Sequence, residues 1–235
     1  MSISKYIHQI CLFDGNKVPS KYKSNISSIK ELNKNWIYKC WNKKELFNLC
    51  LQYSYECANA FNKLTNHNQK ILLKYIILYK FGGIFLDLDC KALKSFDTIP
   101  GLSTKELILS FTPNEFFKNL IFEGTTMKLL NVATIVSTAK NKYINEIIDT
   151  ILSGSINEKI NEKKLVTKIL IKYSDNNISL LNHCYFDSCH SINSCCLISK
   201  EAIVNYRYDY SWMNSWIVWI LGCVFHLKED YDHLM

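Results

Sequence analysis

The stretch KYIILYKFGGIFLDLDC, residues 74–90, constrains the fold of this chain more than any other. Apolar residues recur at helical spacing from 69 to 81 and stop at Gly82 and Gly83, which predicts a helix that ends in a left-handed glycine cap. An apolar run follows at 84–88, with large side chains on both faces of the predicted strand. This pattern is typical of a central parallel strand that is covered by helices on each side.

The same alternation of helices and strands extends over much of the chain. Residues 5–13 and 35–42 are predicted strands, 43–64 have helical spacing, and the alternation continues to about residue 150. Such a pattern favours an α/β fold with a mostly parallel sheet flanked by helices, as in the nucleotide-binding half of a Rossmann-like protein. Because no convincing linker interrupts the 235 residues, we predict a single domain that spans 1–235.

The strand predicted at 84–88 ends in two carboxylates, Asp87 and Asp89. Residues i and i+2 of a strand point the same way, so both acids should face one side, with Leu88 opposite. Close carboxylates repel one another and are costly to bury unless a cation lies near them. At the carboxyl end of a parallel strand they predict a Mg²⁺ or Mn²⁺ site that is completed by phosphate oxygens. Two exposed acids at a strand end are the alternative.

The charge of the chain limits the classes of partner. Lys and Arg number 28 against 21 Asp and Glu, which gives a formal net charge of +7. The basic residues are nearly all lysine and are scattered, which indicates a solvated surface, a phosphate-bearing ligand or an anionic membrane surface. No basic run alternates with aromatic residues and no recognition motif is present, so we expect no nucleic-acid partner.

Cysteine usage and hydropathy bear on the compartment. The 10 cysteines lie inside apolar runs as often as in loops, and the first residues, MSISKYIHQI, contain no long apolar signal segment. The apolar stretch at 216–227 is shorter than the roughly 20 residues that a membrane-spanning helix needs. We therefore expect reduced thiols in a cytoplasmic protein that is soluble or docked on a membrane surface, with 216–227 as a buried element or a docking helix.

Four segments, in this order along the chain, resemble one known family. They are YIHQI at 6–10, NWIYKCWN at 35–42, ILYKFGGIFLDLD at 77–89 and SWMNSW at 211–216. Together they are similar to family 32 of the glycosyltransferases, whose sugar-binding region contains an Asp-x-Asp (DXD) motif. The resemblance implies a GT-A fold and transfer of a sugar from a UDP- or GDP-sugar to a glycan, lipid or protein acceptor. It also implies Mn²⁺ or Mg²⁺ on the diphosphate and retention at the anomeric carbon.

The resemblance further implies roles for single residues. Asp87 would contact the ribose or the sugar of the donor, and Asp89 would hold the metal. Lys74 would meet the phosphates as a point charge, although Ile71 stands where the family usually has an acid. A late metal contact would come from Asp209 or Asn214, and the other positions expected near the nucleotide are Ile7, His8, Gln9, Trp36, Tyr38, Trp41, Gly83, Ser215 and Trp216.

Two other functions fit the same aspartates. A domain that binds nucleotide sugars without turnover is favoured by Ile71 and by the lack of histidines before the final Trp-containing segment. A haloacid-dehalogenase-like phosphatase also has an apolar strand that ends in Asp-x-Asp, with Asp87 as nucleophile and Asp89 as general acid. Against that family, Lys91 stands where it has Thr or Val, and its motif usually lies close to the N-terminus.

Two clusters of side chains allow more than one interpretation. The segment HCYFDSCHSINSCC at 183–196 offers ligands for zinc, but its spacings fit no standard zinc pattern, and a loop or strand with apolar cysteines is the alternative. The aromatic residues of 206–216 either pack in a core or at a sheet edge, or form a lid that stacks on sugar rings and excludes water.

Overall fold

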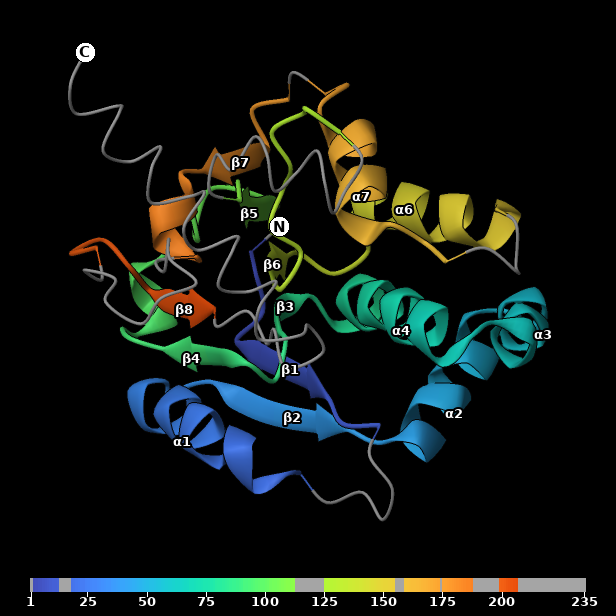
Figure 1. Ribbon diagram of the computed structural model, residues 1–235, viewed down its shortest axis with the longest axis horizontal. Helices are drawn as coiled ribbons and strands as arrows, with labels where there is room; N and C mark the ends of the chain where they lie inside the picture. The colour runs from blue at the N-terminus through green and yellow to red at the C-terminus, as the bar shows by residue number, and fades with distance from the viewer. Residues whose placement is uncertain are drawn as a thin grey trace, which may run out of the picture.

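The structure, a computed structural model, describes residues 2–12, 18–112, 125–154, 159–173, 175–187 and 199–206. Within these residues a six-stranded sheet forms the centre of the molecule (Figure 1). Across the sheet the strands run in the order β2 (Ile37–Trp41), β1 (Tyr6–Ile10), β3 (Gly83–Leu86), β6 (Thr134–Ser137), β5 (Leu107–Ser110) and β7 (Ile178–Leu181). A smaller antiparallel sheet pairs β4 (Cys90–Ala92) with β8 (Val204–Tyr206).

The central sheet is mostly parallel, as the sequence predicts. Strand β1 is parallel to both β2 and β3, and β5 is parallel to β7. Strand β6 is antiparallel to its two neighbours, β3 and β5. The carboxyl ends of β1 and β3 therefore lie at the same edge of the sheet, where residues that follow the two strands can meet.

Helices α2, α3, α4, α6 and α7 cover one face of the sheet, while helix α1 and the small sheet cover the other (Figure 1). The helices are α1 (Lys23–Leu32), α2 (Lys43–Tyr53), α3 (Tyr55–Lys63), α4 (Asn66–Phe81), α6 (Lys142–Ser153) and α7 (Glu162–Leu170). Short 3-10 helices are η2 (Ser20–Tyr22), η3 (Phe96–Thr98) and η4 (His183–Tyr185).

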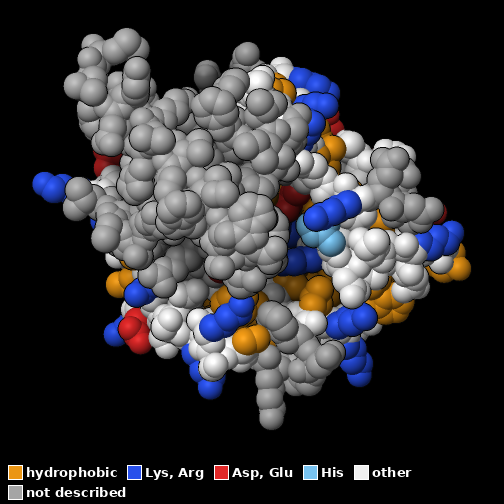
Figure 2. All heavy atoms as spheres, in the orientation of Figure 1, with side chains coloured by type: hydrophobic (Ala, Val, Ile, Leu, Met, Phe, Trp, Pro, Cys, Tyr) orange, Lys and Arg blue, Asp and Glu red, His pale blue; other side chains and the backbone are white. Residues whose placement is uncertain are grey.

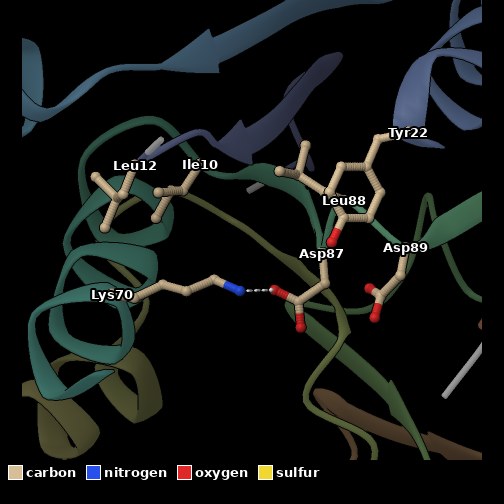
Figure 3. A pocket seen from close by; sticks show the side chains of 7 residues that line it. All are labelled: Ile10, Leu12, Tyr22, Lys70, Asp87, Leu88 and Asp89. Carbon is tan, nitrogen blue, oxygen red and sulfur yellow. Dashed lines mark ion pairs between the residues drawn. The ribbon is translucent and has the colours of Figure 1, made fainter. Parts of the chain in front are cut away.

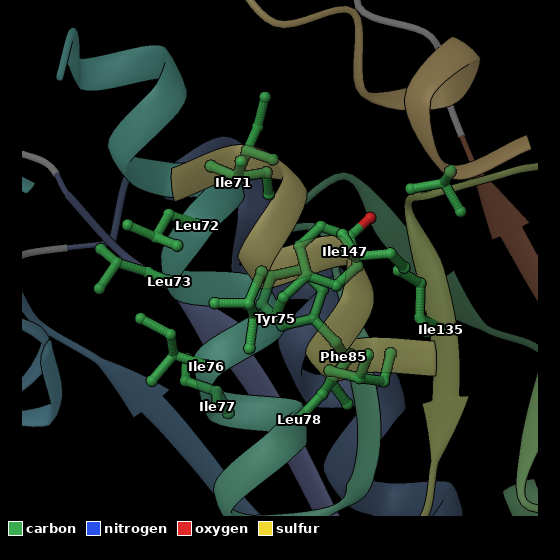
Figure 4. Packing of buried hydrophobic residues seen from close by; sticks show 14 of the residues in the cluster. Ile71, Leu72, Leu73, Tyr75, Ile76, Ile77, Leu78, Phe85, Ile135 and Ile147 are labelled. Carbon is green, nitrogen blue, oxygen red and sulfur yellow. The ribbon is translucent and has the colours of Figure 1, made fainter. Parts of the chain in front are cut away.

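Strand β3 is buried on both faces, as its unbroken apolar run predicts. Phe85 packs in the cluster formed with α4 and α6, where Figure 4 shows it below Tyr75 and beside Leu78. Ile84 and Leu86 pack in the cluster on the opposite face, which includes Ile29 of α1. The α/β prediction is therefore confirmed, whereas the single-domain span 1–235 includes residues outside the described ranges and stays a prediction.

Two helix boundaries differ from those predicted, and polar caps explain both. The region 43–64 contains two helices because Ser54 adopts an extended backbone and its side chain accepts a hydrogen bond from Cys57 N, which caps α3. Helix α4 begins at Asn66, three residues earlier than the apolar pattern, because Thr65 accepts a hydrogen bond from Asn68 N.

Close backbone contacts require the two glycines at the junction of α4 and β3. Gly82 has φ 62° but ψ −161°, so its φ is positive as predicted, whereas the backbone is not in the left-handed helical region of the expected cap. A Cβ at Gly82 would lie 2.5 Å from Ala139 N, and one at Gly83, where φ is 93°, would lie 2.4 Å from Tyr6 O. The turn thus brings β3 directly against β1.

We expect Gly83→Ala to lower the free energy of unfolding by at least about 2 kcal/mol, because the new methyl group meets the Tyr6 carbonyl and the positive φ is strained. Urea unfolding followed by far-UV circular dichroism measures this change. Gly154→Ala is the matched control, because φ there is −75° and the nearest atom, Thr150 O, is 3.3 Å from the added Cβ. Equal stability losses in the two variants would contradict the expectation.

Candidate active site

A pocket of about 260 Å³ lies at the carboxyl edge of β1 and β3. Its lining comes from the ends of both strands, from η2 and from the first part of α4: Ile10, Leu12, Tyr22, Lys70, Asp87, Leu88 and Asp89 (Figure 3). One wall is apolar, with two β1-end residues, Leu88 and the Tyr22 ring. The other wall carries one ammonium and two carboxylates. A ligand with an apolar or aromatic part and a charged part suits such a pocket.

A tight turn, and not strand alternation, positions the two aspartates. Strand β3 ends at Leu86, two residues earlier than predicted, and Asp87 N donates a 2.8 Å hydrogen bond to Ala133 O. Cys90 N donates a 3.0 Å hydrogen bond to Asp87 O, which closes the turn. Both carboxylates line the pocket, as predicted, but Leu88 lines it too and does not point to the opposite side.

Two side chains, one from β1 and one from β2, hold the backbone of Asp87 through successive hydrogen bonds. Gln9 Nε2 donates a 3.1 Å hydrogen bond to Asp87 O, and Tyr38 OH donates a 2.7 Å hydrogen bond to Gln9 Oε1. The Gln9 side chain is fully buried and Tyr38 is half-buried, and neither residue lines the pocket. The two residues, predicted to lie near the nucleotide, instead support the turn that carries the acids.

Among the described residues, Lys70 of α4 is the cation that lines the pocket, and sequence reasoning missed it. Its Nζ lies 3.0 Å from Asp87 Oδ1, with 42% of the Lys70 side chain and 17% of the Asp87 side chain exposed. The attraction of Asp87 raises the pKa of Lys70, against the opposing effect of burial. Burial alone would raise the pKa of Asp87, but Lys70 and then Lys74 outweigh it and hold that pKa below its usual value. Asp87 is therefore ionised at neutral pH.

Lys74, the cation predicted to meet the phosphates, lies behind the pocket in the core. Its side chain is 2% exposed, and its Nζ lies 2.9 Å from a Glu162 carboxylate oxygen. Nζ also donates a 2.8 Å hydrogen bond to Val132 O. Lys74 does not line the pocket, which argues against the direct phosphate contact expected of it. Its charge reaches the pocket by lowering the pKa of Asp87. Ile71 is 2% exposed and packs in the core.

Other positions expected near the nucleotide are packed elsewhere. His8 is 1% exposed, with Nε2 donating to Gly82 O at 2.9 Å and Nδ1 accepting from Trp41 Nε1 at 3.2 Å. Trp36 packs against Phe96 in the cluster on the opposite face of the sheet, where Ile7 also lies. Gly83 is the first residue of β3 and lies four residues before Asp87, which is about 13 Å at the usual rise per residue of a strand. None of these residues lines the pocket.

The buried imidazole of His8 makes stability depend on pH. Burial lowers the pKa of His8 from 6.5 to about 4, so the folded protein holds it neutral while the unfolded chain binds a proton below pH 6.5. Stability is thus full at neutral pH and falls as the pH drops from 6.5 toward 4. The loss attributable to His8 between pH 7 and pH 5 is about 2 kcal/mol.

We expect the free energy of unfolding of His8→Gln to depend less on pH between 7 and 5, because glutamine can still donate to Gly82 O but does not titrate. Urea unfolding of both proteins at pH 7, 6 and 5 measures the difference between the two curves. Parallel curves would show that His8 does not carry the dependence.

Several predicted residues lie outside the described ranges. Among them are the late metal contacts and the segment proposed as a lid: Asp209, Asn214, Ser215 and Trp216. Most of the 183–196 cluster and all of 216–227 also lie outside, so the zinc and docking-helix alternatives stay predictions. Among the described residues, no group of three or more His, Cys, Asp or Glu side chains is placed to hold a metal by itself.

The paired acids nevertheless fit a hard divalent cation that shares its shell with a ligand. Mg²⁺ and Mn²⁺ favour carboxylate oxygens, and Mg²⁺ is commonly held by one or two carboxylates together with substrate phosphates and water. Asp87 Oδ1 is buried and has the Lys70 ammonium beside it, but no well-aligned hydrogen bond. Asp89 lines the same charged wall (Figure 3). These oxygen donors suit such an ion and leave positions for the phosphates.

The pocket and its Asp-x-Asp pair lie within a segment that is similar to a region of known glycosyltransferases. Residues 19–105 match a family described as "Glycosyltransferase sugar-binding region containing DXD motif". The matched range contains Tyr22, Lys70 and both aspartates of the pocket. The predicted resemblance to DXD glycosyltransferases is thereby confirmed.

Individual proteins are also similar to this chain. Inositol phosphoceramide mannosyltransferase 3 of Schizosaccharomyces pombe is 27% identical over 99 residues, which are 42% of this chain and 27% of the relative. The chain thus spans about a quarter of that curated relative's length. The solved PaToxG glycosyltransferase superposes with a TM-score of 0.53 at 17% identity, over 72% of this chain and 69% of that one. This likeness confirms the predicted fold.

Surface features are consistent with the scattered charge seen in the sequence. On the face shown in Figure 2, lysine side chains of the described residues lie at several separate places and form no single stripe. In the described part of the chain, no helix has the length and apolar character needed to cross a bilayer. Cys11, Cys40, Cys50, Cys57, Cys90 and Cys184 form no disulfide bonds. The cytoplasmic location and the membrane-surface association stay predictions.

Proposed function

We propose that this protein transfers a sugar from a nucleoside-diphosphate sugar to a glycan, lipid or protein acceptor, with Mn²⁺ or Mg²⁺ held at Asp89. The observation that carries the proposal is the pocket in which both aspartates of the DXD motif form a charged wall opposite an apolar one. The apolar wall suits a nucleoside and the charged wall suits a metal-bound diphosphate.

The residues of the chain have separate tasks in this proposal. Asp89 holds the cation, and Asp87 accepts a hydrogen bond from a hydroxyl of the donor. The hydrogen bonds from Tyr38 to Gln9 and from Gln9 to Asp87 O fix the Asp87 backbone, so the carboxylates need little reorganisation when the donor binds. A bound divalent cation supplies charge compensation for the diphosphate that leaves. Retention at the anomeric carbon is proposed from the family resemblance, and an assay of product stereochemistry tests it.

The name of the S. pombe relative suggests which donors to try first. That protein is called a mannosyltransferase, so GDP-mannose belongs in a panel with other GDP-sugars and UDP-sugars. The test of the proposal is Mn²⁺-dependent release of nucleoside diphosphate from one member of this panel. Release from none of the donors, together with no binding of UDP or GDP in the presence of Mn²⁺, would contradict the proposal.

One specific observation favours a second function, binding without turnover. Ile71 is buried in the core where the family usually has an acid, so no carboxylate reaches a sugar hydroxyl from that position. Binding of UDP or GDP with Mn²⁺, but no release from any sugar donor, would favour this alternative. The phosphatase alternative loses support, because the family match covers both aspartates. Release of phosphate from a phosphomonoester without a nucleotide sugar would restore it.

A further inference from the structure

The charged wall of the pocket already contains its own counter-ion. Lys70 Nζ lies 3.0 Å from Asp87 Oδ1, and Asp89 lines the same wall (Figure 3). Among the described lining residues, one ammonium and two carboxylates give a formal net charge of −1. A divalent cation would bring this set to +1, with the ammonium close to the arriving ion. A diphosphate ester, which carries about two negative charges, would then restore a net negative site.

Lys70 is able to change partners, whereas the neighbouring lysine is not. The Lys70 side chain is 42% exposed and ends at the pocket, on a stem with four rotatable methylene groups. Lys74 is 2% exposed and is fixed by Glu162 and by Val132 O. Among the lysines of the described residues, Lys70 is therefore the one placed to leave a carboxylate when a metal arrives.

We propose that Lys70 couples metal binding to donor binding. In the free protein its ammonium neutralises Asp87, and in the complex it moves onto a phosphate oxygen of the donor. This inference rests on the proposed function, because it requires a divalent cation and a nucleoside diphosphate at this pocket. It goes beyond that function by naming the residue that makes the two ligands depend on one another.

The proposal has a thermodynamic consequence that can be measured without turnover. A metal ion that binds alone must approach a site with an ammonium in it, so its affinity is low. With the diphosphate present, the ammonium gains a new anionic partner and the metal gains phosphate ligands. Mn²⁺ and nucleoside diphosphate therefore raise one another's affinity by the same factor, as linkage requires.

The experiment is isothermal titration of the full chain and of Lys70→Met with Mn²⁺ alone, with UDP or GDP alone, and with each in the presence of the other. The nucleotide used is the one that binds the unmodified protein. We expect Mn²⁺ alone to bind Lys70→Met about tenfold more tightly, because the competing charge is gone. We expect the coupling factor between Mn²⁺ and nucleotide to fall about tenfold in Lys70→Met, because this variant has no ammonium that could move onto the diphosphate.

Two control variants separate this role from a general loss of charge. Lys70→Arg keeps the positive charge at the pocket and should keep most of the coupling. Lys44→Met removes a charge from the exposed surface of α2 and should leave both affinities unchanged. Circular dichroism and thermal unfolding establish that each variant is folded, which the exposure of Lys70 leads us to expect.

Failure of this inference differs from failure of the proposed function. If both ligands bind and Lys70→Met changes neither the Mn²⁺ affinity nor the coupling factor, the role of Lys70 is wrong and the proposed function stands. If the unmodified protein binds neither Mn²⁺ nor a nucleoside diphosphate, both are wrong. A tighter site for Mn²⁺ together with a reduced coupling factor supports the inference.

Discussion

Asp89→Asn is expected to reduce Mn²⁺-dependent release of nucleoside diphosphate about a thousandfold, which is the size expected when a main electrostatic contact of a reaction is lost. Asparagine keeps the shape of the side chain but carries no charge, so it is a poor ligand for Mn²⁺ or Mg²⁺. Because Asp89 is only partly buried, the substitution should cost little stability. Initial rates of release with the active donor, at saturating Mn²⁺, measure the effect.

The matched control for this prediction is Asp149→Asn. Asp149 is exposed on α6, accepts a hydrogen bond from Asn145 and does not line the pocket. Its variant loses the same charge and should release nucleoside diphosphate at an unchanged rate. Should Asp89→Asn and Asp149→Asn be equally active, a metal role for Asp89 would be ruled out, and with it the proposed mechanism.

Lys74→Met is expected to lower the free energy of unfolding by about 3–5 kcal/mol, the usual cost of removing one partner of a buried ion pair. The variant leaves the Glu162 carboxylate, 13% exposed, without its cation, and leaves Val132 O without the Lys74 donor. For a chain of this size the loss corresponds to a fall of about 10 °C in the unfolding temperature. Differential scanning calorimetry measures it.

The double variant Lys74→Met with Glu162→Gln tests the cause of this loss. Without its charge, residue 162 no longer needs a buried cation, and the glutamine carbonyl can still accept from Tyr75 OH, which donates to Glu162 at 2.7 Å. We expect the double variant to recover roughly half of the stability lost by Lys74→Met. A double variant as unstable as Lys74→Met would mean that lost packing, and not the unpaired charge, causes the effect.

The local pattern of the sequence was enough to predict the centre of the fold. An apolar helix, two glycines and a strand with apolar side chains on both faces fit only a strand with packed layers on each side. The aspartates could be predicted as a ligand site because acids at the end of such a strand need a nearby cation. The position of the strand end could not be predicted, since Ala133 on a distant segment fixes the turn.

The roles of the β1 and β2 residues depended on the neighbours of those strands. Strand β1 lies between β2 and β3 in the sheet, and its two faces pack in the two hydrophobic clusters, with Ile10 in one and Ile7 in the other. His8 is enclosed by Trp41 and the Gly82 carbonyl on one face, and Gln9 is enclosed by Tyr38 on the other. The sequence does not contain this sheet order. The β1 and β2 residues expected near the nucleotide therefore lie outside the pocket lining, and their contacts with a nucleotide stay predictions.

The sequence by itself determined the helix–glycine–strand unit and the paired acids, because local spacing and apolar character fix these elements. Only the tertiary structure decided which lysine of α4 meets the acids. Lys70 and Lys74 have the same chemistry and lie one turn apart on one face of the helix. The tight turn at Gly82 sends β3 back along α4, so the start of the helix lies beside the end of the strand. That geometry brings Lys70 to Asp87 in the pocket and leaves Lys74 in the core.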